Sequence, residues 1–411
     1  MNFFIPENDD LVDPHYDFEN DAYGPGRNGT RTDVYAHEIY GQLNADGVLV
    51  SKSTVKPTKA KAIVEAGGIR KYLRLPEGTK VMGDCGAFQF INEETPPYTC
   101  EEICDYYESC GFDYGITLDH LITVFDVEYD EGQSLFTREP TEDMLFRYEL
   151  TISNAKRMLE LKQQRKLNFE PVGAVQGWSP LSYHMAIRDL IEAGYRYLAI
   201  GGMARASNSE IEPLLREIGP AIRETDVKLH FLGVARTNVL DSFAEAGITT
   251  CDSASTILQA FKSNKENYHT PERTYCAVRI PPVMGDTSPK VHKLLKGIKH
   301  DPDALAKEMK RLHALETKAL KSVRAYASGK TDLSAAMKDL VAYEDQFGDE
   351  KKYYPLFEET LRDRPWEQCE CSICKDLGVE VVILRGNNRN RRRGFHNTWV
   401  FYQRFLEKIG R

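Results

Sequence analysis

Short apolar runs alternate with amphipathic stretches over residues 46–285. Between the runs, apolar positions recur at helical spacing, as in 182–193, 208–224 and 240–245. The predicted buried strands are 47–50, 80–82, 114–118, 171–175, 197–200, 229–232 and 248–251, with 275–279 as the candidate for an eighth. Strands that alternate with helices pair in parallel through right-handed crossovers. Seven or eight of them in about 200 residues favour an α/β fold, a closed (β/α)8 barrel of the TIM type.

The pattern changes on both sides of this alternation. The first forty residues are polar, carry aromatic patches and show no clear period, so residues 1–45 are expected to form an N-terminal arm or lid. Over 302–345 the apolar positions, such as Leu305, Met309 and Leu312, follow helical spacing. The predicted domains are therefore an arm (1–45), a catalytic barrel (46–285) and a helical, basic C-terminal region with a zinc-binding subdomain (286–411).

Three of the nine cysteines stand close together near the end of the chain. Cys369, Cys371 and Cys374 form a C-x-C-x2-C cluster, and His396 follows 22 positions later. Three thiolates and one imidazole are the donors of a closed, tetrahedral structural zinc site. We therefore predict a structural Zn²⁺ that ties down the C-terminal segment. The three cysteines within residues 100–110 are expected on a helix as ordinary packing residues.

Composition and charge narrow the class of protein. Hydrophobic residues make up 41% of the chain and charged residues 28%, which is typical of a globular protein. No apolar run approaches the roughly 20 residues that span a bilayer. The N-terminal sequence MNFFIPENDD lacks the basic start of a secretory signal. We therefore expect a cytoplasmic protein without a membrane partner.

Two basic clusters stand out against a net charge of −9. Residues 290–330 hold eleven Lys or Arg against four Asp or Glu, and a solvated helix face explains such a run. The denser cluster lies in RGNNRNRRRG, which we interpret as a Gly/Asn-rich loop that binds nucleic-acid phosphates. Its members are Arg385, Arg389, Arg391, Arg392 and Arg393. The competing interpretation pairs them with acidic residues of the same chain.

The carboxyl ends of the predicted strands carry the candidate chemistry, because active sites of such barrels gather there. These ends hold GDCGAFQ (83–89), LDH (118–120), VQG (175–177), GGM (201–203), GV (233–234) and CDS (251–253). This set suits base exchange at a glycosidic carbon. One carboxylate can attack the anomeric carbon. Another can pass protons to the leaving base and from the incoming base, and a third can accept from the donors of a guanine-like ring.

In this order, the motifs resemble those of the tRNA-guanine transglycosylase superfamily. The resemblance covers roughly residues 80–400 and includes the zinc motif, in which His396 is followed by Asn397. It implies a barrel enzyme with Asp252 as the nucleophile and Asp84 as the general acid/base. The residues that it implies for base binding are Asp119, Gln176, Gly201, Gly202, Met203, Phe88 and Gly233.

The chain departs from the tRNA enzymes after Asp252. Residues 253–258 read SASTIL, where the bacterial tRNA enzymes carry Pro-Thr-Arg and Arg-Asn-Gly. No C-terminal RNA-binding domain of the archaeal kind is visible, and the arginine-rich segment before His396 also differs. These features are similar to the DNA-guanine transglycosylase branch of deazapurine-in-DNA systems. That branch implies exchange of guanine in DNA for 7-cyano-7-deazaguanine (preQ0) or a relative, with other DNA-modification proteins as candidate partners.

Three other interpretations remain at this point. A tRNA-guanine transglycosylase with a divergent recognition surface would act on tRNA instead of DNA. A barrel glycoside hydrolase would use Asp84 and Asp252, but it leaves the cysteine motif and the Gln and Gly-Gly turns unexplained. A DNA-binding protein that has lost catalysis would not need the full set of aspartates.

Overall fold

The computed structural model describes residues 1–130, 139–284, 289–348 and 351–411. The chain divides into two compact units, each of which is described by itself. The barrel unit consists of Met1–Asp9, Ala45–Ala254 and Phe405–Arg411, and the second unit consists of Asp10–Asn44 and Ser255–Arg404. The domain boundary predicted at residues 285–286 lies outside the described residues. No helix within the described residues is both long and apolar enough to cross a membrane.

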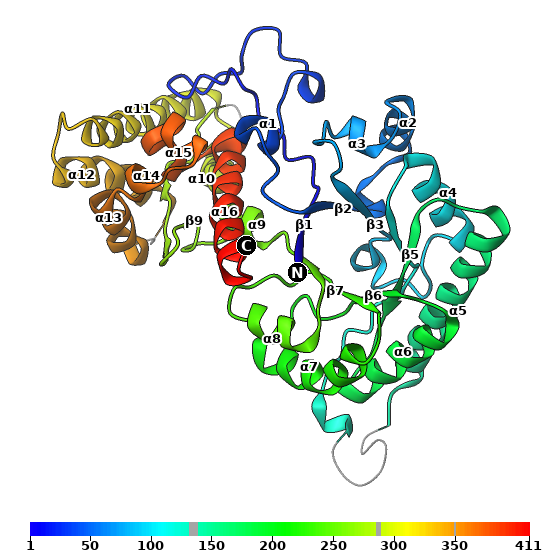
Figure 1. Cartoon of the computed structure of the whole chain (residues 1–411). Coiled ribbons are helices and arrows are strands. Elements are labelled where there is room, and N and C mark those ends of the chain that lie inside the picture. The colour runs from blue at the N-terminus through cyan, green and yellow to red at the C-terminus, as the bar shows by residue number, and fades with distance from the viewer. Residues whose placement is uncertain (131–138, 285–288, 349–350) are drawn as a thin grey trace. The chain divides into compact units, whose positions relative to one another are not determined.

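Eight parallel strands form a closed barrel in which each strand pairs with its neighbour in chain order (Figure 1). The strands are β1 (Asn2–Pro6), β2 (Gly47–Ser51), β3 (Lys80–Asp84), β4 (Tyr114–Ile116), β5 (Glu170–Val175), β6 (Tyr197–Ile200), β7 (Lys228–Phe231) and β8 (Thr250–Asp252). The main helices of this unit are α2 (Pro57–Glu65), α3 (Ile69–Tyr72), α4 (Cys100–Cys110), α5 (Glu142–Arg165), α6 (Pro180–Ala193), α7 (Asn208–Arg223) and α8 (Leu240–Ala246). The predicted TIM-type barrel is confirmed.

The barrel closes through a strand that the sequence pattern did not indicate. β1 pairs in parallel with β2 on one side and with β8 on the other. The expected eighth strand at 275–279 is wrong, because its residues belong to the second unit, in β10 (Thr274–Tyr275) and β11 (Val278–Arg279). The expected arm also differs, since its first residues form a barrel strand. The chain continues from β1 into the second unit over 10–44, so no strand-helix repeat marks β1.

Apolar side chains fill the barrel interior. The buried set comprises Phe4, Leu49, Met82, Ile116, Val172, Ala174, Tyr197 and Ala199, drawn from β1 to β6. Burial of a large apolar side chain contributes about 1.5–3 kcal/mol. Gly47 makes room for this packing, because a Cβ at that position would lie 2.4 Å from the Phe4 ring. The interior is therefore a packed core that holds the strand ends above it in place.

The longer helices of the barrel unit bury one face each, and α4, α5, α6 and α7 begin after a capping Ser or Thr. In α7, apolar residues at helical spacing, among them Ile211, Leu215 and Ile218, are buried. α6 begins after Ser179, whose side chain accepts from Ser182 N–H, and ends before Gly194 in the left-handed conformation. The cysteines of residues 100–110 lie on α4 and are buried, as predicted.

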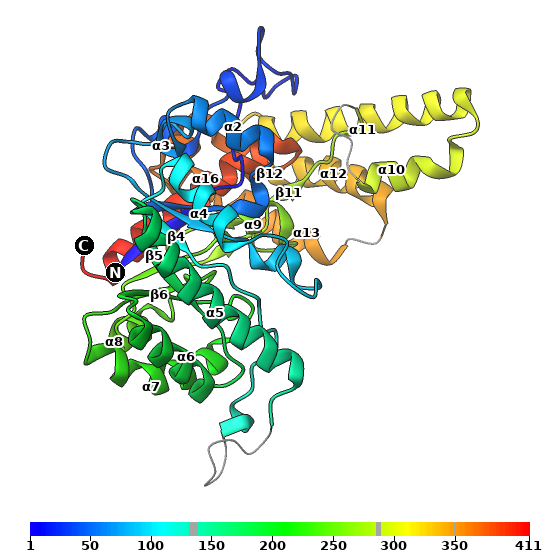
Figure 2. The ribbon, with the colours of Figure 1, turned by 90° about the vertical axis from the view of Figure 1, so that its right-hand side faces the viewer.

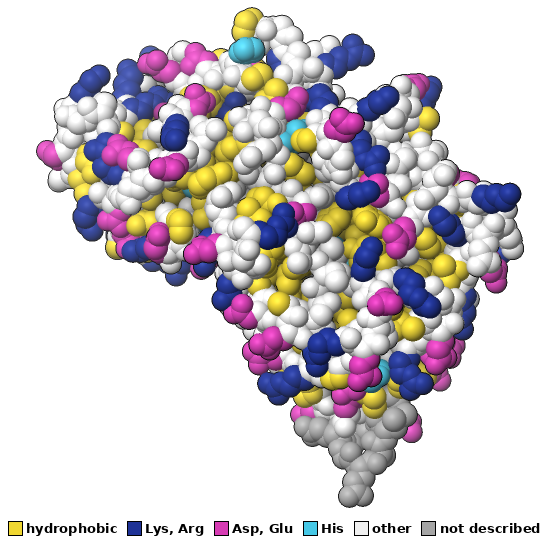
Figure 3. All heavy atoms as spheres, viewed as in Figure 1, with side chains coloured by type: hydrophobic (Ala, Val, Ile, Leu, Met, Phe, Trp, Pro, Cys, Tyr) yellow, Lys and Arg dark blue, Asp and Glu magenta, His cyan; other side chains and the backbone are white. Residues whose placement is uncertain are grey.

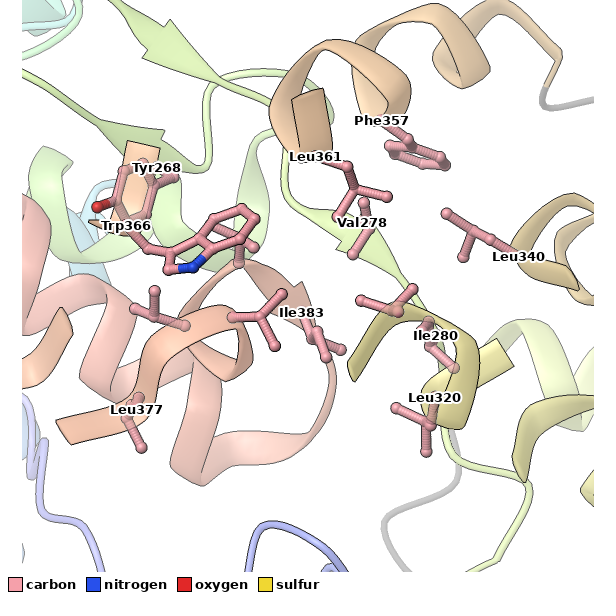
Figure 4. Packing of buried hydrophobic residues seen from close by; sticks show 14 of the residues in the cluster. Tyr268, Val278, Ile280, Leu320, Leu340, Phe357, Leu361, Trp366, Leu377 and Ile383 are labelled. Carbon is pink, nitrogen blue, oxygen red and sulfur yellow. The ribbon is translucent and has the colours of Figure 1, made fainter. Parts of the chain in front are cut away.

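The second unit is mainly helical around its own core (Figure 4). Its longer helices are α11 (Pro302–Ala327), α12 (Leu333–Glu344), α13 (Tyr354–Asp363) and α16 (Gly386–Lys408), the last of which runs on into the barrel unit. The helical region predicted over 302–345 is confirmed as two helices, α11 and α12, which lie side by side (Figure 2). Asp332 caps the second of them by accepting from Ala335 N–H.

The arginine-rich segment is helical and points inward. Apart from Arg385, which directly precedes it, the segment belongs to α16 rather than to a loop, and Arg385, Arg389, Arg392 and Arg393 are at most 8% exposed. Arg393 donates to the carbonyl oxygens of Ala260, Val381 and Ile383. Arg392 donates to Asn388 Oδ1 and to Asp13 O. The guanidinium groups thus donate hydrogen bonds to polar atoms in the interior of the second unit.

Carboxylates from distant parts of the chain complete this buried network. Arg389 pairs with Asp21 and with Glu380, the latter at 2.7 Å. Arg385 pairs with Asp21 at 2.6 Å and with Glu316 at 2.5 Å. The prediction that these four arginines contact DNA phosphates is therefore wrong, because their N–H groups are buried and already bonded. Arg391 differs from these four, because 33% of its side chain is exposed. It also donates to Leu11 O.

We predict that Arg389→Ala strongly destabilises the second unit. The change removes a buried guanidinium that pairs with the partly buried carboxylates of Asp21 and Glu380, and loss of one partner of such a buried pair typically costs about 3–5 kcal/mol. Arg404→Ala is the matched control, since Arg404 lies on the same helix but is exposed. Thermal unfolding followed by circular dichroism should show a clearly lower midpoint for Arg389→Ala alone. Equal midpoints for the two variants would contradict the structural role assigned to Arg389.

Candidate functional site

The candidate catalytic residues gather at the carboxyl-terminal rim of the barrel. Asp84 ends β3 and Asp252 ends β8, while Asp119, Gln176 and Gly201 follow β4, β5 and β6. All eight strands are parallel and consecutive, so these positions share one rim. The strand order thus brings together the residues that the sequence motifs singled out.

Asp119 lies at the centre of a buried hydrogen-bond cluster. Its Oδ2 accepts from Gln176 Nε2 at 2.6 Å, and its Oδ1 accepts from the Cys85 thiol at 2.9 Å. Gln176 Oε1 in turn accepts from Ile122 N–H at 3.3 Å. Burial raises the pKa of Asp119 above its ordinary value. The cluster fixes a carboxylate and an amide side by side, which is an arrangement that can read a ring with adjacent donors and acceptors.

Gly201 and Gly202 let the backbone pass directly beside this cluster. A Cβ at Gly201 would lie 2.2 Å from Gln176 Nε2. Gly202 has φ of +79°, and a Cβ there would lie 2.7 Å from the hydroxyl of Tyr183. That hydroxyl donates to Gly201 O at 2.8 Å. Larger residues at either glycine would therefore displace Gln176 or Tyr183.

Asp84 has the most perturbed carboxylate of the rim. Burial raises its pKa to about 7, and the neighbouring charges of Asp119 and Asp252 act in the same direction. Hydrogen bonds from Gly86 N–H and the Ser51 hydroxyl offset part of this effect. A carboxyl group with a pKa near neutrality can both give and take a proton at physiological pH, as a general acid/base must.

Asp252 is held by one oxygen only. Its Oδ1 accepts from Gly233 N–H at 2.8 Å and lies 3.1 Å from His230 Nε2. Both interactions orient the side chain. No hydrogen bond to Oδ2 is found among the described residues, so this oxygen is available to a substrate. Gly233 is expected to bind the base, but its N–H donates to Asp252 Oδ1.

His230 extends the interactions of Asp252 into the barrel interior. Its Nδ1 lies 2.8 Å from the Thr250 hydroxyl, which lies 2.7 Å from the Tyr197 hydroxyl. His230 is fully buried on β7. This chain of polar groups lies outside the strand-end motifs, although a histidine within the apolar run 229–232 is a visible signal in the sequence. The chain holds the imidazole in one orientation toward Asp252.

The remaining predicted base-binding residues differ in exposure. Phe88 lies in a short 3-10 helix just after β3 and is 48% exposed, which leaves its ring accessible. Met203 is fully buried and follows the Gly201-Gly202 turn. Phe88 therefore presents an exposed aromatic ring, whereas Met203 contributes a buried apolar side chain.

The second unit contains the candidate metal centre. Cys369, Cys371, Cys374 and His396 each offer one ligand atom, and these four atoms lie within 4.8 Å of one another. His396 Nδ1 is 3.4–3.5 Å from each of the three sulfur atoms. Two cysteines flank the start of α15 (Ser372–Leu377), the third lies on it, and His396 comes from α16. The predicted four residues thus form one cluster that can hold a metal ion.

Neighbouring groups orient the histidine of this cluster. His396 Nε2 donates to His269 O at 2.8 Å, so Nδ1 carries the lone pair that faces the thiols. The Tyr268 ring stacks on the imidazole at 4.1 Å. Asn397 accepts from His269 N–H and donates to Asn267 O and Thr256 O. This network orients the imidazole of His396 toward the three thiols.

Comparisons with known proteins agree with the motif order. No protein-family model matches the chain. A DNA-guanine transglycosylase from Salmonella montevideo is 36% identical over 417 aligned positions, which span 98% of this chain and 96% of that protein. A tRNA-guanine(15) transglycosylase from Pyrobaculum aerophilum is 27% identical over 184 positions, or 44% of this chain and 34% of that protein.

The first of these similarities extends over nearly the whole of both chains, including the barrel and the second unit. The second, more distant similarity supports the wider superfamily. Together they confirm the resemblance drawn from the strand-end motifs and the cysteine cluster. The chain belongs to the DNA-guanine transglycosylase family, whose members are base-exchange enzymes of the glycosyltransferase type.

Proposed function

We propose that this enzyme exchanges guanine in DNA for a 7-deazaguanine base, preQ0 or a relative, through a covalent sugar–Asp252 intermediate. The observation that carries the proposal is the pairing of two unlike carboxylates at one rim. Asp84 has a pKa near 7, whereas Asp252 is oriented through one oxygen and presents the other. A carboxyl group that can give and take a proton near neutral pH suits the acid/base role, and an oriented carboxylate with an unbonded oxygen suits the nucleophile role.

The proposed reaction has two displacements at C1′ of the deoxyribose. In the first, Asp252 Oδ2 bonds to C1′ as the bond from C1′ to guanine breaks, and protonated Asp84 gives its proton to the departing base. In the second, ionised Asp84 takes a proton from the incoming base, whose nitrogen displaces Asp252 from C1′. Each carboxylate returns to its starting state, as a retaining mechanism requires.

Base recognition is assigned to the cluster beside these carboxylates. Asp119 can accept from the N1–H and exocyclic amine of guanine or of a 7-deazaguanine. The Gln176 amide and the backbone N–H of Gly202 can bind the ring's carbonyl, the missing side chain of Gly201 leaves room for the ring, and the exposed Phe88 ring can stack on its face. A base inside duplex DNA cannot reach such a pocket, so it must be flipped out at a cost of a few kcal/mol.

The proposal is tested by following labelled guanine into nucleic acid. We expect the purified enzyme to incorporate radiolabelled guanine into genomic DNA but not into bulk tRNA, since guanine-for-guanine exchange needs no deazaguanine. Competition by preQ0 should then suppress the incorporation.

The matched control is Asp252→Asn, which keeps the size of the side chain and removes its nucleophilicity. It should abolish incorporation and also any enzyme–DNA adduct that survives denaturing electrophoresis. Incorporation into tRNA alone would instead identify a tRNA-guanine transglycosylase, and an active Asp252→Asn variant would exclude the assigned nucleophile.

The raised pKa of Asp84 predicts that the stability of the protein depends on pH. The pKa of Asp84 is about 7 in the folded protein, above the ordinary value of 3.8. The protonation of Asp84 therefore adds to the free energy of unfolding, fully below about pH 4, and this contribution is lost as the pH rises through 7. Asp84→Asn removes the buried charge and should therefore raise the thermal midpoint relative to wild type at pH 8. This gain should shrink toward pH 5, although exchange is lost at every pH.

Thermal unfolding at both pH values, together with exchange assays, checks this expectation. Asp226→Asn is the control, because Asp226 is an exposed carboxylate of the same unit and should give no such difference. If Asp84→Asn were less stable than wild type at pH 8, the raised pKa of Asp84 would not stand.

We further propose that the cysteine cluster holds a structural Zn²⁺. Zn–S bonds of about 2.3 Å and a Zn–N bond of about 2.0–2.1 Å, at a tetrahedral angle, place N and S about 3.6 Å apart. The distances from His396 Nδ1 to the three sulfurs, 3.4–3.5 Å, fit this value. With four protein ligands the metal would have no open position, so its contribution is to stability rather than to chemistry.

We expect about one equivalent of zinc per chain in the purified protein. Cys371→Ser should lower the metal content well below one equivalent and lower the thermal midpoint, because ligand loss removes folding free energy. Cys276→Ala is the control, since Cys276 is buried in the same unit but lies outside the cluster. Elemental analysis that finds full zinc in Cys371→Ser would refute the ligand assignment.

A further inference from the structure

Burial of the arginines of α16 leaves another segment as the main basic surface of the second unit. Residues 289–330 hold eleven Lys or Arg and four Asp or Glu, an excess of seven positive charges. The whole chain has a net charge of −9, so the remainder carries −16. This segment comprises α10 (Pro289–Leu295), a short 3-10 turn and α11. Positive charge is therefore concentrated on one part of an otherwise acidic protein.

Five of the six cations of α11 share one face of the helix, whereas the sixth, Arg324, lies outside that face and pairs with Glu380. At 3.6 residues per turn, the five fall within a sector of roughly 100°. The members are Lys307, Lys310, Arg311, Lys318 and Lys321, all of them exposed. The opposite face is buried and includes Leu312, Glu316 and Val323. The helix therefore presents a continuous basic face, which we call the lysine face, and it is held in place by its packed side.

Most of this charge is not neutralised within the chain. Among the residues that the structure describes, Lys307, Lys310 and Lys321 make no ion pair. Lys318 pairs with Asp339 at 2.8 Å, and Arg311 pairs with Glu308 at 2.6 Å. In both pairs the cation itself is exposed, and pairs at the surface contribute at most about 1 kcal/mol. An anionic partner could therefore engage the whole face at little cost.

The composition of the face indicates what kind of partner it fits. Protein–protein interfaces are enriched in aromatic residues, Met and Arg and depleted in Lys, and the lysine face has the opposite composition. Lysine is a flexible point charge that suits phosphate contacts without reading bases. Residues 307–321 span about 21 Å, because an α-helix rises 1.5 Å per residue. That length matches about six steps of 3.4 Å along one DNA strand.

We propose that the lysine face of α11 binds the DNA phosphate backbone, independently of base sequence. The inference rests on the proposed function, in which DNA is the substrate, and it extends that function by a binding surface outside the barrel unit. Figure 3 shows Lys and Arg side chains standing out over α11. The acidic remainder of the chain would repel DNA elsewhere, so binding is directed to this face. Two further exposed lysines precede α11 in the same segment, Lys293 on α10 and Lys296 in the 3-10 turn that follows it.

The test replaces the three unpaired lysines together, as Lys307→Gln, Lys310→Gln and Lys321→Gln. Binding of a random-sequence DNA duplex is measured by fluorescence anisotropy over a range of salt concentrations. Each lost phosphate contact should flatten the slope of log K against log salt by about 0.9, so the triple variant should flatten it by about 2–3. Affinity should fall similarly for unrelated sequences, and the thermal midpoint should stay unchanged because the three side chains are exposed.

The matched control carries Arg at the same three positions and should keep the wild-type slope. An unchanged slope in the Gln variant, with wild-type enzyme that binds and exchanges guanine in DNA, overturns the lysine face and leaves the proposed function intact. Wild-type enzyme that exchanges guanine only in tRNA overturns the proposed function instead. Lysine-dependent binding to tRNA or to acidic lipid vesicles, without lysine-dependent binding to DNA, also overturns the inference.

Discussion

Closure of the barrel by β1 is the constraint on which the rest of the site depends. β1 pairs with β2 on one side and with β8 on the other, and Phe4 stands opposite both Gly47 and Asp252. Without this strand, β2 and β8 would expose unpaired edges, which proteins avoid. The end of β8 carries Asp252, so its place relative to Asp84 and Asp119 on the same rim is set by a strand from the start of the chain.

The three aspartates of the rim have the same side chain but different surroundings. Asp84 is buried near two other carboxylates, which disfavour its charge. Asp252 receives a backbone N–H and an imidazole at one oxygen. Asp119 is bonded to a thiol and an amide at its two oxygens. Three aspartates thus acquire three different environments, which is what a reaction with a nucleophile, a proton carrier and a recognition group demands.

Sequence alone could predict those features whose physical cause is local. The alternation of strands and helices, the polar residues directly after each strand and the close spacing of Cys369, Cys371 and Cys374 are all visible in short windows. Asp84, Asp119, Gln176 and Asp252 could be placed together because parallel strands end at a common rim.

Features that depend on distant partners could not be predicted in this way. β1 has no helix of its own within the barrel unit, so nothing nearby marks it as a strand. Arg389 is charged and lies among Gly and Asn, which is typical of a surface loop, but its partners Asp21 and Glu380 come from other parts of the chain. His230 is similar, since its role depends on Thr250 and Asp252 of the next strand. In each case the decisive contact joins residues whose sequence context is uninformative.

The path of the chain between the two units has a consequence for how such an enzyme can evolve. The backbone passes from one unit to the other four times, after residues 9, 44, 254 and 404. Residues 10–44 leave the barrel after its first strand and are anchored in the second unit, for example through Asp13 and Asp21. No single recombination point in a gene can therefore add or remove the second unit intact. A gain or loss of the second unit therefore requires at least two coordinated changes in the gene, one for each of its two segments.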